Sequence, residues 1–359
     1  MDAGGHVKTV TLVGAGGNIG SHLVPHLGRM PGVSRVTLVD RDIYEERNLY
    51  SQDILPGDIG KPKALVQAAR LSAINPALQV IPVVESVENQ PLGTLRADVM
   101  LTALDSRRSR QCVNEIAWRL RMPWCDSGVR SEELLARITV YVPGENAPCL
   151  ECAWSDSDYE KIEQVYPCDD MTGTNEVPTN APSCLGALAA SLQALECGKI
   201  LEGRLDRTAV DRQITIEAQW HHYYETRYRR NPECRFDHKS WNIEKLRCDP
   251  DKFTVEDALR LGDRIELDRM QFVKKLMCPG CGGERSLFYL SAALSPEARK
   301  CAVCGTTMIT TGFDTLERID GRSSKQLLRC SFEEIGLRKG DVFRSGNDRY
   351  LEITGRDPE

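Results

Sequence analysis

The chain has 359 residues, more than one hydrophobic core usually holds, so we expect a main domain and at least one appended module. Its 41% hydrophobic and 27% charged residues, with 28 Gly and 18 Pro, exclude collagen, coiled coils and long disorder. The formal charge of -6 argues against a protein that coats nucleic acid or an anionic membrane. The sequence shows no secretory signal and no uninterrupted apolar run that could span a membrane, so we expect a cytoplasmic location.

Strand-like and helix-like segments alternate in the first part of the chain. We expect strands at 7–13, 36–39, 78–84, 99–104, 123–125, 136–142 and 213–218, and helices from the first glycine-rich turn to about residue 30 and at 60–74, 107–121 and 183–201. This rhythm predicts an α/β fold: a Rossmann-like, mostly parallel sheet with helices on both faces. The polar stretch 153–182 is typical of a long functional loop.

After about residue 240 the pattern changes to short, charged segments around two cysteine pairs. A small β-rich tail follows at 337–353. We therefore expect a main domain over residues 1–240 and a C-terminal module over 241–359.

A glycine-rich turn, Gly14-Ala15-Gly16-Gly17-Asn18-Ile19-Gly20, joins the first strand to the first helix. Such a turn places backbone N–H groups and the positive end of a helix against a phosphate, and Gly14, Gly16, Gly17 and Gly20 allow close approach. Asp40 ends the second strand and can accept hydrogen bonds from ribose hydroxyls. We expect a nucleotide site. A dehydrogenase that uses NAD fits the same pattern, and so does a tight turn without a ligand.

The 14 cysteines do not indicate a disulfide framework, because the cytosol keeps thiols reduced, so we expect metal binding or catalysis to explain several of them. Six of them form three Cys-x-x-Cys pairs, namely Cys149/Cys152, Cys278/Cys281 and Cys301/Cys304. The last two pairs are separated by 19 residues, which predicts a structural zinc ribbon over 278–304, with a redox dithiol as the alternative. The first pair needs two ligands from elsewhere in the chain.

A longer, ordered set of motifs resembles the ThiF/MoeB family, the adenylating core shared with ubiquitin-activating enzymes. The motifs are Asp40-Arg41-Asp42, Asn48-Leu49, Ser51-Gln52, Gly60-Lys61-Pro62-Lys63, Asn75-Pro76, Asp105 with Arg110 and Asn114, Gly128, Cys149-x-x-Cys152, Ser191-Leu192-Gln193-Ala194-Leu195-Glu196 and Asn231-Pro232-x-Cys234. The resemblance covers residues 7–238. It implies ATP-dependent adenylation of the C-terminal glycine carboxylate of a ubiquitin-like or sulfur-carrier protein, with ATP and magnesium. Lysine and magnesium would neutralise the charge that gathers on the phosphates.

The resemblance assigns roles to individual residues. It makes Lys63 the phosphate-contacting lysine, Asp105 the magnesium ligand, Asp40 and Asp42 the ribose and metal-side pair, and Asn48 and Gln52 the polar residues under the phosphates. The alternatives are that Lys63 is a solvated helix lysine and that Asp105 is a helix N-cap.

The sequence departs from the family pattern in two places. The glycine loop has one more residue before its last glycine, and Ser51 stands where the family commonly has an arginine. Arg47, Arg107 and Arg110 are candidate replacements, and we favour Arg110 for stabilising the leaving group. Arg110 could instead pair with a carboxylate at the rim of the sheet.

The resemblance also supplies the missing zinc ligands and a candidate nucleophile. It points to Cys234, and where the family often has a second cysteine the sequence offers Asp237 or His238, of which we favour His238. Relatives often pass the acyl group to a cysteine, and Cys168 lies where the family places it. Cys184, at the first turn of a predicted helix, is an alternative, as is the absence of a catalytic cysteine.

The expected partners follow from the same resemblance. They are a ubiquitin-like protein with a C-terminal glycine and a second copy of the chain. The charge and the lack of a long apolar run indicate that neither a membrane nor nucleic acid is a partner. The C-terminal module occupies the place where ubiquitin-activating enzymes carry a module that recruits a conjugating enzyme. Two other functions fit parts of the sequence: an NAD-dependent oxidoreductase and a non-catalytic scaffold.

Overall fold

The structure is a computed structural model that describes residues 7–163, 181–346 and 348–355. The chain divides into two compact units, one of residues 1–88 and 96–240 and one of residues 89–95 and 241–359. The boundary after residue 240 coincides with the change in sequence pattern. Sequence reasoning missed the short segment 89–95 of the second unit, where the Gly93 N–H donates to the Gly340 carbonyl (2.8 Å).

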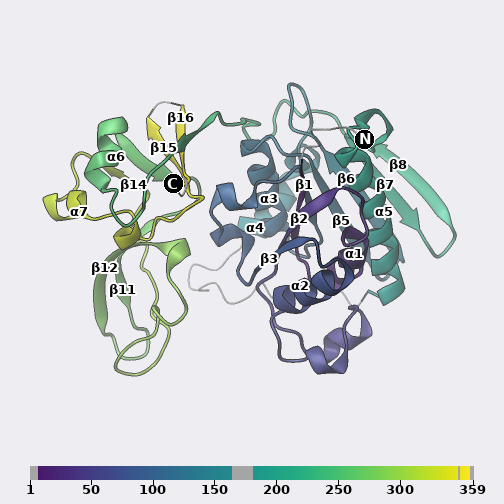
Figure 1. Ribbon diagram of the computed structural model, residues 1–359, viewed down its shortest axis with the longest axis horizontal. Helices are drawn as coiled ribbons and strands as arrows, with labels where there is room; N and C mark the ends of the chain where they lie inside the picture. The colour runs from purple at the N-terminus through teal and green to yellow at the C-terminus, as the bar shows by residue number, and fades with distance from the viewer. Residues whose placement is uncertain (1–6, 164–180, 347, 356–359) are drawn as a thin grey trace. The chain divides into compact units, whose positions relative to one another are not determined.

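An eight-stranded sheet forms the centre of the first unit, in the order β3-β2-β1-β4-β5-β6-β7-β8 (Figure 1). The strands are β1 (Lys8–Val13), β2 (Val33–Val39), β3 (Gln79–Val83), β4 (Val99–Thr102), β5 (Trp124–Arg130), β6 (Leu135–Tyr141), β7 (Arg212–Glu217) and β8 (His222–Arg227). The first five in this order are parallel, and β6, β7 and β8 continue the sheet antiparallel. All residues of β8 are exposed, so no hydrophobic pattern marked it in the sequence.

Helices cover both faces of this sheet. They are α1 (Asn18–Leu27), α2 (Lys63–Ile74), α3 (Arg107–Arg119), α4 (Asp156–Glu163) and α5 (Ser183–Leu201), with 3-10 turns η1 (Glu46–Tyr50), η2 (Pro56–Asp58), η3 (Val87–Asn89), η5 (Leu150–Ala153) and η6 (Leu205–Arg207). Helices α1, α2 and α5 share one face with the main hydrophobic core. On the other face lies α3 (Figure 1), which packs against η5.

Two of these helices differ from simple readings of the sequence. Helix α4 lies inside the stretch that we expected to be a loop. The sequence did not predict this helix because its short, acidic segment has little apolar periodicity. Helix α5 is long and apolar enough to pass for a membrane span by length and composition. Its Leu185, Ala189, Ala190 and Ile200 are buried in the core against the sheet.

The second unit contains two smaller sheets. Its elements are η4 (Leu92–Leu95), β9 (Ile243–Leu246), α6 (Val255–Leu261), β10 (Arg264–Leu267), β11 (Phe272–Met277), β12 (Glu284–Leu290), η7 (Ser291–Ala293), β13 (Thr315–Leu316), β14 (Arg318–Asp320), α7 (Lys325–Arg329), η8 (Glu333–Ile335), β15 (Val342–Gly346) and β16 (Arg349–Ile353). One sheet has the order β14-β10-β15-β16-β9 and the other β12-β11-β13. Phe272, Phe332 and Phe343 are fully buried in the larger core of this unit.

The strand order of the first unit reverses at β1, which pairs with β2 on one side and β4 on the other. In open parallel sheets, ligands bind beyond the carboxyl ends of the strands at such a switch point. The glycine-rich turn follows β1, Asp40 follows β2, and Asp105 follows β4. The fold therefore brings these three segments to one edge of the sheet.

Candidate functional site

The glycine-rich turn packs against two other segments of the switch point. Gly14 has a φ of +81°, and a Cβ at this position would lie 2.4 Å from the Ala103 carbonyl oxygen. A Cβ at Gly16 would lie 2.4 Å from Cβ of Lys63. The turn is thus held between the first residue of α2 and the segment that leads from β4 to Asp105. Glycine is required at both positions for steric reasons.

Gly16→Ala is expected to destabilise the first unit by about 1–3 kcal/mol, because the added methyl group overlaps the Lys63 side chain. Gly17→Ala is the matched control, since its Cβ would meet atoms only at 3.6 and 3.7 Å. Urea unfolding of the two variants measures the difference. Equal stability of the Gly16 variant and the wild type would contradict this packing.

Asp40 is buried beneath the turn and braces it. Its carboxylate accepts the N–H of Gly16 (2.8 Å) and the N–H of Asp42 (3.0 Å), one on each oxygen. Burial raises the pKa of Asp40, while the charge of Lys63 and these two N–H groups act in the opposite direction. A carboxylate oxygen can accept more than one hydrogen bond, so both oxygens can still receive a ribose hydroxyl.

Lys63 stands at the start of α2, beside the turn. Its Nζ lies 3.3 Å from Oδ2 of Asp42 and 5.7 Å from the centre of the Tyr44 ring. The Lys63 side chain is only 10% exposed, whereas that of Asp42 is 57% exposed. This burial is inconsistent with a solvated helix lysine. The arrangement gives one fixed positive charge next to the backbone N–H groups of the turn.

Asp105 is exposed at the end of the β4 segment, two residues after Ala103. The N-cap of α3 is Ser106, whose side chain accepts the Ser109 N–H, so Asp105 is not the cap. Within residues 7–163, 181–346 and 348–355 its carboxylate forms no ion pair. Exposed carboxylates such as those of Asp105 and Asp42 are donors that magnesium prefers, so these residues fit that ion.

The two predicted amide residues have different surroundings. The side-chain oxygen of Asn48 accepts the Glu45 N–H (2.8 Å) and so caps η1. The side-chain oxygen of Gln52 is buried and has no hydrogen-bond partner in the described part of the chain. Gln52 therefore retains an unused acceptor, whereas the Asn48 oxygen already serves the local fold.

Arg110 occupies a structural position that differs from the expected one. Its Nε donates to the fully buried carboxylate of Asp126 (3.1 Å), and its guanidinium also donates to the carbonyls of Leu104 and Ser127. The geometry favours the alternative of a carboxylate pair over a group that stabilises the leaving pyrophosphate. Through Leu104, Arg110 instead positions the segment that carries Asp105.

The other two candidate arginines are also paired. Arg47 pairs with Glu45 (2.6 Å), and its side chain is exposed. Arg107 pairs with Asp158 of α4. These contacts do not identify either side chain as the replacement for the arginine that the family commonly has at the position of Ser51.

Cys149, Cys152, Cys234 and His238 gather into one cluster, with all four ligand atoms within 4.8 Å of one another. The Cys149 sulfur lies 3.8 Å from that of Cys152 and 3.7 Å from that of Cys234. Ligands about 2.3 Å from a tetrahedral zinc ion would be about 3.8 Å apart. The donor set and spacing therefore fit zinc.

His238 is oriented for metal binding by its second ring nitrogen. Nδ1 lies 2.7 Å from the Phe236 carbonyl oxygen, to which it can donate, and Nε2 lies 3.2 Å from the Cys152 sulfur. This hydrogen bond fixes the tautomer that leaves the Nε2 lone pair free as a ligand. The sequence offered Asp237 or His238 as the fourth ligand. The Asp237 carboxylate instead accepts a hydrogen bond from Arg119 (2.7 Å).

The second cluster, in the second unit, consists of Cys278, Cys281, Cys301 and Cys304. The sulfurs of Cys278 and Cys304 are 3.3 Å apart, and those of Cys281 and Cys301 are 3.6 Å apart. Cys278 and Cys281 lie in the turn between β11 and β12. Four thiols from two knuckles at these distances can hold a structural zinc ion.

The candidate nucleophile Cys168 lies outside the described residues. Cys184 is exposed near the start of α5, and Cys112, Cys125 and Cys197 are buried. Burial raises the pKa of Cys125 and of Cys197, the latter to about 12, which keeps both thiols protonated.

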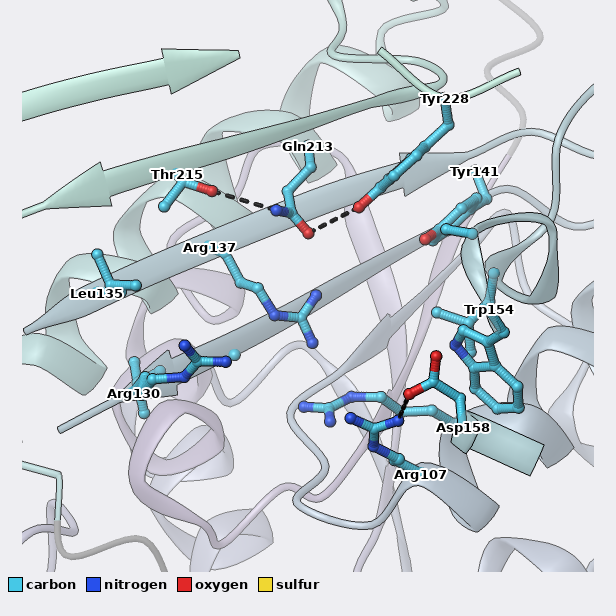
Figure 2. A pocket seen from close by; sticks show the side chains of 15 residues that line it. Arg107, Arg130, Leu135, Arg137, Tyr141, Trp154, Asp158, Gln213, Thr215 and Tyr228 are labelled. Carbon is cyan, nitrogen blue, oxygen red and sulfur yellow. Dashed lines mark hydrogen bonds and ion pairs between the residues drawn. The ribbon is translucent and has the colours of Figure 1, made fainter. Parts of the chain in front are cut away.

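A cavity of about 540 Å³ lies over the antiparallel part of the sheet, next to α3 (Figure 2). Its lining includes Arg107 and Arg110 of α3, Gly128 and Arg130 of β5, Arg137 and Tyr141 of β6, Gln213 and Thr215 of β7, and Trp154, Asp158 and Tyr228. Sequence reasoning did not single out Arg137. The alternating apolar and polar residues of 135–141 were the available signal, because residues two apart share one face of a strand.

Comparison with known proteins agrees with the family resemblance found in the sequence. The model of the ThiF family matches residues 6–236. The sulfur carrier protein adenylyltransferase of Thermus thermophilus is 30% identical over 242 residues, which are 63% of this chain and 80% of that protein. The molybdopterin-synthase adenylyltransferase of Escherichia coli is 28% identical over 231 residues, which are 63% of this chain and 85% of that protein.

Two further relatives are matched over a smaller part of their length. The ubiquitin-like modifier-activating enzyme 5 of Oryza sativa is 31% identical over 161 residues, 40% of this chain and 37% of that enzyme. A solved structure of Escherichia coli MccB with ATP matches with a TM-score of 0.53 and 23% identity, over 64% of this chain and 65% of that one. The MccB likeness supports the fold alone.

Proposed function

Because the chain belongs to the ThiF family, we propose that it adenylates the C-terminal glycine carboxylate of a ubiquitin-like or sulfur-carrier protein, with ATP as the co-substrate. The relatives that match most of their length are adenylyltransferases, one of a sulfur carrier protein and one of molybdopterin synthase. The observation that carries the proposal is the position of Lys63, against Gly16 and beside Asp42, at the switch point of the sheet.

The residues at this edge suit attack of a carboxylate on the α-phosphate. The new bond joins a carboxylate oxygen to the α-phosphorus, and the bond to the pyrophosphate oxygen breaks. Negative charge then gathers on the α-phosphate oxygens and on the departing pyrophosphate. The Lys63 ammonium and the N–H groups of the glycine turn would neutralise this charge without reorganising.

Asp105 and Asp42 would hold magnesium, whose chemical contribution is to polarise the phosphate oxygens. Asp40 would contribute by holding the turn and by accepting hydrogen bonds from the ribose. The cysteine clusters would hold zinc as structural ions, because each offers four protein ligands and leaves no position open.

The later steps and the partners are proposals from the family resemblance. The acyl group would pass to the Cys168 thiolate, forming a thioester and releasing AMP. The active form would be a homodimer in the cytoplasm. The second unit would recruit a conjugating enzyme. In this it would have the same role as the C-terminal module of ubiquitin-activating enzymes.

Exchange of labelled pyrophosphate into ATP tests the proposal, using candidate proteins that end in glycine. Exchange is expected only when the glycine tail is present. A reducible adduct between the enzyme and the substrate protein is also expected, and Cys168→Ser should abolish it. A scaffold would give no exchange with any tail. A dehydrogenase would instead show an absorbance change with NAD, and either result would refute the adenylation proposal.

A further inference from the structure

The cavity beside α3 is surrounded by more positive than negative groups (Figure 2). Four arginines line it, namely Arg107, Arg110, Arg130 and Arg137, and they pair with three carboxylates, those of Asp126, Asp158 and Glu133. The imbalance lies at Asp126. This single buried carboxylate is 3.1 Å from Nε of Arg110 and 3.2 Å from a terminal nitrogen of Arg137.

Arg137 presents the excess charge to the cavity. Its side chain is 31% exposed, whereas that of Arg110 is 13% exposed. In Figure 2 its guanidinium extends from β6 toward the middle of the cavity. Gly128 lies opposite on β5, and a Cβ there would be 3.0 Å from Nε of Arg137. The absence of a side chain at Gly128 thus leaves room for the guanidinium, whose remaining N–H groups can bind an anion.

The far end of the cavity is flat and aromatic. The rings of Tyr141 and Tyr228 are parallel within 8°, with centres 6.3 Å apart. The Tyr228 hydroxyl donates to Gln213 (2.9 Å), and the Gln213 amide donates to Thr215 (3.2 Å). These polar groups satisfy one another, and Tyr141 is buried between Trp124 and Tyr228, so the aromatic surface that this end offers to a bound peptide comes from the partly exposed Tyr228 ring. The volume is within the usual range for ligand sites.

The cavity adjoins the proposed adenylation site through one helix. Asp105 directly precedes Ser106, the N-cap of α3, and Arg107 and Arg110 lie in the first turn of α3. Arg110 also donates to the Leu104 carbonyl, one residue before Asp105. A peptide whose carboxylate reaches the α-phosphate can therefore lie along the cavity with the residues that precede its terminal glycine.

We infer that this cavity selects substrate tails that carry an acidic side chain shortly before the terminal glycine, and that Arg137 receives that side chain. The inference rests on the proposed function and adds the substrate class. An arginine fork binds a carboxylate through two parallel hydrogen bonds. An arginine or lysine side chain in the tail would meet the excess positive charge and be rejected.

Binding of labelled peptides to the full-length protein tests the inference without ATP. Each short, fluorescein-labelled peptide ends in Gly-Gly and carries Glu, Gln or Lys at one preceding position. Fluorescence anisotropy is expected to show about 10-fold or more tighter binding for the best Glu peptide than for its Gln counterpart, and the weakest binding for Lys.

Arg137→Gln is expected to bring the Glu and Gln peptides within about 2-fold of each other, because the charge-assisted hydrogen bonds are lost. Arg137→Lys keeps the charge without the fork and should retain part of the preference, which separates recognition from a folding defect. Arg212→Gln is the matched control. Arg212 lies on the neighbouring strand, pairs with Glu225 (3.3 Å) outside the cavity lining, and should leave the preference unchanged.

Equal binding of Glu and Gln peptides to the wild type, or a preference that survives Arg137→Gln, would overturn the inference. So would a failure of all peptides to bind, or pyrophosphate binding that depends on Arg137 while the peptide side chain has no effect. The two proposals can fail separately. Pyrophosphate exchange that is equal with Glu and Gln peptides would refute the selectivity alone, and selective binding without exchange would refute adenylation alone.

Discussion

Replacing Lys63 with methionine is expected to lower the rate of ATP–pyrophosphate exchange by about 100-fold or more. Lys63 is the buried cation at the glycine turn, with its Nζ 3.3 Å from Asp42. Methionine keeps an unbranched side chain that can still pack on Gly16, so the turn should keep its shape. The charge that would balance the phosphate oxygens is lost, and exchange with a glycine-tailed substrate measures the effect.

Lys61→Met is the matched control for this experiment. Lys61 lies two residues away, pairs with Asp58 (3.6 Å) and has a side chain that is 59% exposed. Its replacement should change the exchange rate by less than about 2-fold, because exposed pairs contribute little. If Lys63→Met retained exchange within a few-fold of the wild type, the assignment of the nucleotide site would be wrong.

Cys234→Ser is expected to remove one of two zinc ions from the purified protein and to destabilise the first unit by about 4 kcal/mol or more. The cluster joins η5, which contains Cys152, and its N-cap Cys149 to residues more than 80 positions later in the chain. Without the metal, buried thiols and an imidazole remain with no ion to order them. Elemental analysis and urea unfolding measure the two effects.

The same change is expected to weaken the binding of glycine-tailed peptides, because Leu150, Ala153 and Trp154 of this knuckle line the cavity. Cys184→Ser, at an exposed cysteine outside both clusters, should leave two zinc ions and unchanged stability. His238→Cys should also keep the metal, since a thiolate can replace the imidazole. Two zinc ions in the Cys234 variant would refute the ligand set.

Much of the parallel half of the fold could be predicted from local sequence. The strands before the glycine turn and before Asp40 are short runs of β-branched and apolar residues, and their buried positions agree with that pattern. Strand β8 and helix α4 escaped prediction because one is exposed along its whole length and the other is short and acidic. Neither leaves a hydrophobic period that could identify it.

Chemistry that depends on neighbouring residues could be derived from the order of amino acids: the glycine turn after a strand, the three Cys-x-x-Cys pairs and the succession of acids and lysine along the chain. The pairing of distant side chains became known only from the folded chain. The fold placed Arg110 on Asp126, excluded Asp237 in favour of His238, and set Arg137 against Gly128. The reason is physical, because strand register and helix packing bring together residues far apart in sequence, and the charge balance of a cavity depends on which of them meet.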